Sequence, residues 1–110
     1  MENNYWIKKQ CQELFEQAQK QEREGDYSSA VESYRRCILV EPENAQILYN
    51  LGIAYAEIMD VDNAIINWRK AIWLEPKFRS ELAEAFLIDD ELAETVIEDE
   101  TTYWESHKAA

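Results

Sequence analysis

Residues in the stretch 30–42 recur, matched in size or chemical type, 34 residues further along the chain. The matched pairs are Ala30 with Ala64, Tyr34 with Trp68, Cys37 with Ala71, and Pro42 with Pro76. An internal repeat of this length is typical of helical units that stack on one another and present an extended surface. We therefore expect a repeat protein, and a binding function before a catalytic one.

Composition favours helices in one compact domain. The chain has 110 residues, 46% of them hydrophobic, which is enough for a modest core. It contains only 2 Gly and 2 Pro, and its β-branched residues do not alternate strictly with polar ones as they would in a strand. We expect an all-α fold without a sheet.

Apolar spacing and turn residues predict four helices in two pairs, at about 5–24, 27–40, 45–57 and 61–74. Gly25 ends the first helix, and Asp26 stands where an N-cap side chain accepts from the free amides of the second. Asp60 takes the same place before the fourth helix. Gly52 lies inside the third helix and costs about 1 kcal/mol of helix propensity relative to Ala, so we expect a close helix contact there.

These residues resemble the tetratricopeptide repeat (TPR) family, in which helix-turn-helix units of about 34 residues stack into a superhelix with a concave groove. The units correspond to residues 11–44 and 45–78. The second unit matches the family signature at Leu48, Leu51, Gly52, Tyr55, Ala64, Trp68, Ala71 and Pro76. The first departs from it at Gln17 and Gln21, and the second at Met59. The resemblance implies antiparallel helix-turn-helix repeats in a short right-handed superhelix, an α-solenoid.

Two stacked units leave one apolar side of the last helix uncovered, so a capping helix is expected after them. Leu82, Ala85 and Phe86 have helical spacing and place this helix at about 79–89. A further short acidic helix at 90–98 is an option for the segment that follows.

The net charge of −12 is concentrated toward the C-terminus. Residues 1–80 carry 13 acidic and 10 basic side chains, whereas residues 81–110 carry 10 acidic side chains and one basic one. We expect one helical domain over residues 1–98 and an acidic tail over 99–110. Nucleic acid is not expected as a partner, because its phosphates would be repelled there and no basic stripe stands elsewhere. A basic protein or peptide has the matching charge.

Targeting and membrane signals are not found in the sequence. The first residues lack the basic start and apolar run of a signal peptide, and no stretch approaches the roughly 18 apolar residues of a membrane span. We expect a cytoplasmic protein without a membrane partner.

Catalytic and metal-binding patterns are also not found. The single histidine, His107, stands close to the C-terminus, and no phosphate loop or nucleophile elbow is present. Cys11 and Cys37 lack the spacing of metal ligands, so we expect packing thiols, and a disulfide between them has no specific support. We expect no enzymatic activity, no metal and no cofactor.

The resemblance implies which residues face the groove, because the first helix of each TPR unit lines it. Transferred to this sequence, the groove consists of Gln12, Phe15, Gln19, Gln46, Tyr49, Asn50, Ile53, Glu57 and Leu87. The apolar floor would consist of Phe15, Tyr49, Ile53 and Leu87. Asn50 would hold a peptide backbone by a two-sided amide contact. The alternative is that Phe15 and Ile53 belong to the core.

One specific ligand of the family is not expected here. The TPR clamp for the C-terminal carboxylate of heat-shock chaperones uses Lys and Arg in the groove, and only Asn50 matches its pattern. Glu16 and Glu84 stand where cations would be needed, so an acidic tail would be repelled.

A second surface is suggested by Leu39 and Trp73, which are repeat mates at a position that usually faces water in the family. Three groups could cover them: the N-terminal Tyr5 and Trp6, the tail with Tyr103 and Trp104, or another molecule. We favour cover from within the chain.

The sequence therefore predicts a small two-repeat adaptor, scaffold or chaperone-like assembly factor that binds a peptide or helix of a partner protein. The alternative is a structural protein whose repeat ends or aromatic surface form a homo-oligomer.

Overall fold

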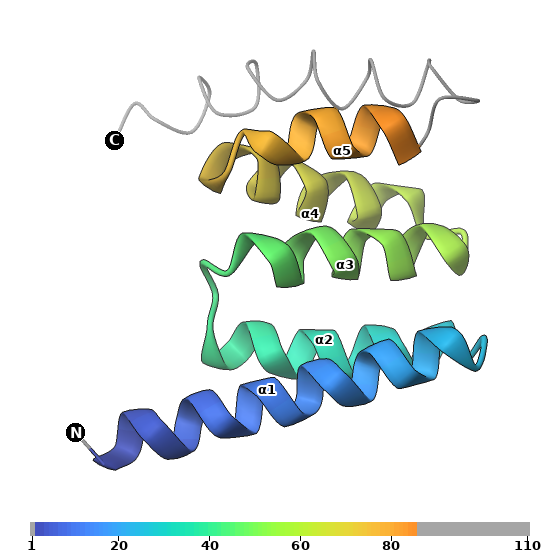
Figure 1. Ribbon diagram of the computed structural model, residues 1–110. Coiled ribbons are helices and arrows are strands. Elements are labelled where there is room, and N and C mark those ends of the chain that lie inside the picture. The colour runs from blue at the N-terminus through green and yellow to red at the C-terminus, as the bar shows by residue number, and fades with distance from the viewer. Residues whose placement is uncertain (1, 86–110) are drawn as a thin grey trace.

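The computed structural model describes residues 2–85, and these form five helices (Figure 1). The helices are α1 (Glu2–Arg23), α2 (Tyr27–Val40), α3 (Ala45–Glu57), α4 (Val61–Leu74) and α5 (Lys77–Ala85). Each helix packs against the next one along the chain. The described residues contain no strand, and the all-α prediction is confirmed. Within residues 2–85, no helix combines the length and the apolar content needed to cross a membrane.

Side-chain caps start three of the helices. Asp26 and Asp60 each accept a hydrogen bond from the backbone N–H three residues further on, both at 3.3 Å, and both predicted caps are confirmed. Asn44 caps α3 in the same way at 3.2 Å, a role that we did not assign from the sequence. The caps satisfy amides that have no partner inside the helix.

The turn inside each helix pair has the same backbone conformation. Gly25 has φ 78° and Met59 has φ 67°, so both lie in the left-handed region. The amide of the next residue, Asp26 or Asp60, bonds back to a carbonyl five residues earlier, at 2.8 and 2.9 Å respectively. The departure from the family pattern at Met59 therefore leaves the turn unchanged, although glycine adopts this φ without the Cβ crowding that methionine has.

The core is continuous along the stack and divides into two groups of buried side chains. One group, mainly between α1, α2 and α3, contains Cys11, Leu14, Ala18, Ala30, Val31, Tyr34, Cys37, Ile47, Leu51 and Ala54. The other, between α3, α4 and α5, contains Ala45, Leu48, Tyr49, Ala64, Trp68, Ala71, Ile72, Phe78 and Leu82. Ile38 and Tyr55 pack against both groups and join them.

Gly52 makes the close helix contact that its place in the sequence predicts. A Cβ at this position would lie 2.4 Å from Nε1 of Trp68 on α4. The indole is fully buried, and its N–H donates to the carbonyl of Tyr49 at 3.3 Å. The ring therefore cannot move aside without losing a buried hydrogen bond.

The capping helix begins directly after Pro76, two residues earlier than predicted. Phe78 and Leu82 of α5 are fully buried, and Phe78 stacks on Tyr49 with ring centroids 4.9 Å apart. This stacking anchors the first turn of α5 on α3. The predicted extension of this helix to residue 89, the option of a helix at 90–98 and the tail at 99–110 lie outside the described residues.

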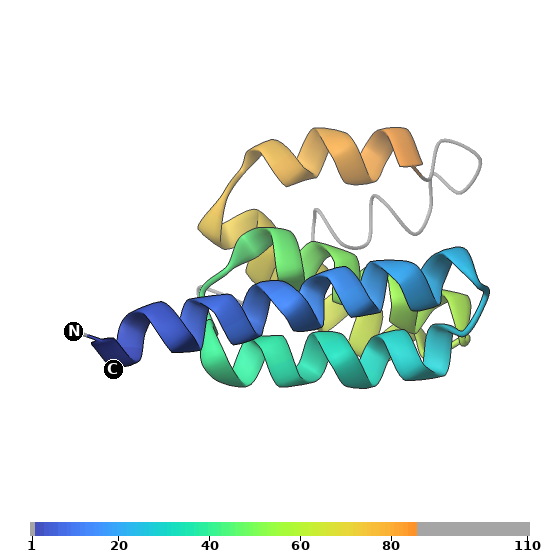
Figure 2. The ribbon, with the colours of Figure 1, turned by 60° about the horizontal axis from the view of Figure 1, so that its bottom comes forward.

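The N-terminal end of α1 projects past the end of α2 (Figures 1 and 2). Helix α1 starts at Glu2, earlier than predicted, and Tyr5 and Trp6 near its start are 64% and 62% exposed. Leu39 is 84% exposed and Trp73 is 56% exposed. The option that Tyr5 and Trp6 cover Leu39 and Trp73 is therefore wrong, because all four side chains remain exposed. Tyr103 and Trp104 lie outside the described residues.

Candidate functional site

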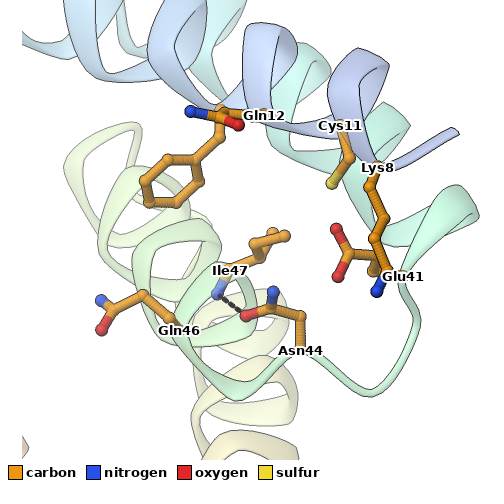
Figure 3. Close-up of a pocket in the computed structure, with 8 residues that line it drawn as sticks. Lys8, Cys11, Gln12, Glu41, Asn44, Gln46 and Ile47 are labelled. Carbon is orange, nitrogen blue, oxygen red and sulfur yellow. Dashed lines mark hydrogen bonds between the residues drawn. The ribbon is translucent and has the colours of Figure 1, made fainter. Parts of the chain in front are cut away.

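A pocket of about 350 Å³ lies between α1, the start of α3 and the turn that joins α2 to α3 (Figure 3). It is lined by Lys8, Cys11, Gln12, Phe15, Glu41, Asn44, Gln46 and Ile47. In Figure 3, Cys11 and Gln12 of α1 face Ile47 and Gln46 of α3 across the pocket. Three of the predicted groove residues, Gln12, Phe15 and Gln46, are therefore brought together here.

The pocket combines an apolar floor with a polar rim. Cys11 and Ile47 are buried, and Phe15 is half-buried with its ring edge-on to Tyr34 at a centroid distance of 5.7 Å. Lys8 and Gln46 on the rim are exposed. Such a site can take an apolar side chain of a ligand while the rim contacts polar groups next to it.

A chain of hydrogen bonds leads from the rim into the space between the helices. Gln46 Nε2 donates to Asn50 Oδ1 at 3.0 Å, and Asn50 Nδ2 donates to the Tyr34 hydroxyl at 3.5 Å. The Tyr34 hydroxyl in turn donates to the carboxylate of Glu22. The chain joins three helices and fixes the orientation of the Asn50 amide.

Burial changes the acidity of the groups at the far end of this chain. It raises the pKa of Tyr34, and the Glu22 carboxylate raises it further, so the hydroxyl stays protonated and donates. Burial also raises the pKa of Glu22, against the lowering effect of the Tyr34 hydrogen bond, and the charge of Glu57 adds to the increase. Glu22 is thus a half-buried carboxyl whose charge is only partly compensated.

The two cysteines are packing groups. Both are free and buried, Cys37 Sγ donates to the carbonyl of Cys11 at 3.3 Å, and Cys11 Sγ donates to the carbonyl of Cys37 at 3.8 Å. Burial is the largest cause of the raised pKa of each thiol, so both stay neutral. Across residues 2–85, no group of acidic, cysteine or histidine side chains has an arrangement that could hold a metal ion.

Comparison with known proteins agrees with this geometry. Residues 23–58 match the family model described as TPR repeat. The fold is similar to that of a solved structure, the second TPR of Spaghetti (RPAP3) bound to HSP90 peptide SRMEEVD, with a TM-score of 0.69. The two share 23% sequence identity, and the match covers 93% of this chain and 98% of that one.

The fold of this chain is therefore that of a tetratricopeptide repeat structure, and residues 23–58 match the TPR repeat family model. The five helices correspond to two repeats and a cap, so the fold resemblance drawn from the sequence is confirmed. No curated protein matches the sequence at a significant level.

The predicted apolar floor of the groove is less exposed to solvent than we expected. Tyr49 is only 8% exposed, because Phe78 of α5 stacks on it. Phe15 and Ile53 are half-buried and pack against the core while keeping part of their surface accessible, and their role in a groove stays a prediction. Leu87 lies outside the described residues.

The remaining predicted groove residues are accessible. Glu57 is exposed, and Gln19 and Asn50 are half-buried. Asn50 already uses one donor and one acceptor inside the protein, which leaves one N–H and one lone pair for a ligand. The expected two-sided contact of this amide with a peptide stays a prediction.

Five pocket residues were not among those predicted from the sequence, namely Lys8, Cys11, Glu41, Asn44 and Ile47. Cys11 and Ile47 belong to the core, Lys8 precedes the first unit, and Glu41 and Asn44 lie in the turn that joins α2 to α3. None of the five therefore holds a groove position. The signal that could have indicated them is the Asn44 cap, which fixes where the turn meets α3.

The second predicted surface has a smaller hollow. A pocket of about 190 Å³ is lined by Pro42, Glu43, Leu48, Lys70, Trp73 and Leu74. Leu39 does not line it, so the two repeat mates do not share one pocket.

Proposed function

We propose that this protein is a non-enzymatic interaction module, acting as an adaptor, scaffold or chaperone-like assembly factor, that binds a peptide or helix of a partner protein between α1 and α3. The observation that carries the proposal is the pocket of about 350 Å³ at which Gln12, Phe15 and Gln46 meet. A structural neighbour, the second TPR of Spaghetti, is bound to an HSP90 peptide, which supports a peptide as the class of ligand.

The chemistry of the site fits an extended or helical segment. Phe15 and Ile47 offer apolar surface to a side chain. The primary amides of Gln12, Gln46 and Asn50 supply donors and acceptors for a peptide backbone, which carries both. The proposal includes the cytoplasmic location expected from the sequence, where free thiols such as those of Cys11 and Cys37 stay reduced.

The peptide SRMEEVD is not expected to be the ligand of this chain. Glu16 and Glu84 are exposed carboxylates at the groove positions where a carboxylate clamp needs cations. The acidic peptide would meet like charge there. Calorimetric titration is expected to show no binding, and an affinity in the micromolar range would contradict this interpretation.

The proposed function is tested by filling the pocket. Peptides selected from a displayed random library on the full chain are measured by calorimetry against the wild type and Gln46→Trp. Gln46 is exposed at the rim, so we expect the larger side chain to keep the fold and weaken binding about tenfold or more, which is about 1.4 kcal/mol. Gln17→Trp, at an exposed position of α1 outside the pocket, is the matched control. Equal affinities for the two variants would contradict the proposal.

Self-assembly is the second candidate function, and the exposed rings of Tyr5 and Trp6 with Leu39 favour it. Sedimentation of the full chain at several concentrations separates the two candidates. A mass that rises with concentration supports assembly, and a constant monomer mass leaves the groove proposal.

A further inference from the structure

We infer that the groove takes a positively charged peptide segment, which places an apolar side chain in the pocket between α1 and α3 and a lysine or arginine beside Glu22 and Glu57. This inference rests on the proposed function, because it names the chemistry of the peptide that the same groove would bind.

Carboxylates approach this side of the molecule from three helices. The Tyr34 hydroxyl joins Glu22 of α1 to the groove amide of Asn50 on α3, because it donates to the Glu22 carboxylate and accepts from Asn50. Burial raises the pKa of the Glu22 carboxyl, and the charge of Glu57 on α3 raises it further. Glu81 and Glu84 of α5 act in the same way on the hydroxyl of Tyr49. Acidic groups of α1, α3 and α5 therefore favour a positive group of a ligand on this side of the molecule.

Basic groups do not balance these charges. Within residues 2–85, the groove positions named above carry the carboxylates Glu16, Glu57 and Glu84 and no lysine or arginine, and Arg23 lies next to Glu22 at the end of α1. A lysine or arginine of a ligand would lower the energy of this arrangement, whereas an aspartate or glutamate would raise it.

The Lys8 end of the pocket is close to neutral. Lys8 and Glu41 both line it, and their charges have opposite sign. This end therefore suits an uncharged side chain of the ligand, and the charged contact belongs toward Glu22.

The geometry sets the spacing between the two contacts. Phe15 in the pocket and Glu22 are seven residues apart on α1, a distance of about 10 Å along the helix axis. An extended peptide advances about 3.3 Å per residue, so the apolar and the basic side chain are about three residues apart.

Another chain is the occupant with the matching charge. Residues 86–110 of this chain, which follow α5, carry 8 acidic side chains and one basic one, and so have the same sign as the acidic groups of the groove. Like charge disfavours this segment, from the same or from a second copy, relative to a basic segment of a partner.

The experiment begins with the selection of random displayed peptides on the full chain. We expect the enriched peptides to contain more lysine and arginine than aspartate and glutamate. The affinity of the most enriched peptide is then measured by fluorescence anisotropy for the wild type, Glu57→Gln, Glu57→Lys and Glu32→Gln. Glu32 is exposed on α2 outside the pocket lining, so Glu32→Gln makes the same charge change at a different place.

The expected losses follow the strength of exposed charge pairs. Glu57→Gln is expected to weaken binding about threefold, Glu57→Lys about tenfold, and Glu32→Gln less than about twofold. The wild-type affinity is expected to fall as salt is raised, because these charges are partly exposed to solvent.

Other results overturn the inference in distinguishable ways. Enriched peptides without an excess of basic residues would overturn it and leave the proposed function standing. Basic peptides that lose equal affinity with Glu57→Gln and Glu32→Gln would be bound to another acidic surface, such as the C-terminal residues, and would overturn it as well. No enrichment of any peptide would overturn the proposed function and this inference together.

Discussion

The two repeats share one backbone arrangement but fill it with different aromatic residues, and the difference concerns the groove. In the second unit Trp68 is the large ring between the helices, and its N–H is used inside the unit, on the carbonyl of Tyr49. In the first unit the matching ring is Tyr34, whose hydroxyl bonds Glu22 and receives a bond from Asn50. The same structural position thus bonds a backbone carbonyl in one unit and the side chains of Asn50 and Glu22 in the other.

The neighbour of each ring is matched to its size. Gly52 lies against Trp68, whereas Ala18 holds the corresponding place in the first unit and is buried in one cluster with Tyr34. The larger indole needs the smaller partner, because only glycine leaves room for it. Each repeat therefore has a complementary pair, and exchange of one member alone disrupts packing.

The largest expected effect comes from breaking the pair of the second unit. Gly52→Ala puts a methyl group 2.4 Å from Trp68 Nε1, inside a fully buried site, and overpacking of this kind costs about 3 kcal/mol. Urea unfolding measures the loss. Helix propensity alone predicts a gain of about 1 kcal/mol, so any stabilisation by Gly52→Ala would contradict the contact.

The control for this prediction places in the second unit the alanine and tyrosine that form the pair of the first unit, Ala18 and Tyr34. In the double variant Gly52→Ala with Trp68→Tyr, the two changes should partly compensate, with a coupling of about 1 kcal/mol or more, because the side chains touch. Purely additive losses would show that the ring and the glycine do not constrain one another.

The next effect concerns the ring of the first unit. Tyr34→Phe keeps the packing but leaves the half-buried Glu22 carboxylate without its hydrogen-bond donor, a loss of about 2 kcal/mol for a bond to a charged group. Thermal or urea unfolding measures it. Tyr5→Phe, on an exposed tyrosine, is the control and should stay close to wild type. Equal stability of Tyr34→Phe and wild type would contradict a stabilising role of the Tyr34 hydroxyl.

The turns give a smaller effect of opposite sign. Met59→Gly is expected to stabilise the protein by about 1 kcal/mol, because methionine is held at φ 67°, where glycine has no steric cost. Gly25→Ala, at the matching turn, is expected to lose a similar amount. Chemical denaturation measures both, and a loss in Met59→Gly would mean that contacts of the methionine side chain outweigh the strain.

The smallest effect depends on pH. The pKa of Glu22 is raised in the folded state, so the folded protein binds a proton more tightly than the unfolded chain between the two pKa values. Stability from this group is therefore lost as the pH rises from the ordinary glutamate value through the folded one. Glu22→Gln removes the titration, so its stability relative to wild type should be higher near neutral pH than below the ordinary glutamate value.

This last comparison needs a matched charge change. Glu32→Gln alters net charge by the same amount at an exposed site on α2. A pH dependence that is identical for the two variants would assign the effect to overall charge and would exclude Glu22 as its source.

The repeat offset and the cap residues predicted most of the fold. Spacing within α1 to α4 is local information, and Asp26, Asp60 and Gly52 have roles that follow from their places in helices and turns. The burial of Tyr49 did not follow from its unit position, because it depends on the stacking of Phe78 from the next element.

The candidate site could be predicted only in part for a similar reason. Gln12 and Gln46 were found because they hold groove positions within the units. Lys8 lies before the first unit, and Glu41 lies in the turn that joins α2 to α3, so neither holds a groove position within a unit. The hydrogen bond from Tyr34 to Glu22 was missed because a residue assigned to the core also has a polar end.

The central claim is that peptides bind between α1 and α3, and nuclear magnetic resonance tests it most directly. The isotope-labelled full chain is titrated with the most enriched selected peptide, and the backbone amide shifts are mapped on the structure. The account predicts the largest shifts at Gln12, Gln46 and Ile47, with little change at Arg35 on the exposed face of α2. Shifts confined to the surface of Leu39 and Trp73 would contradict it.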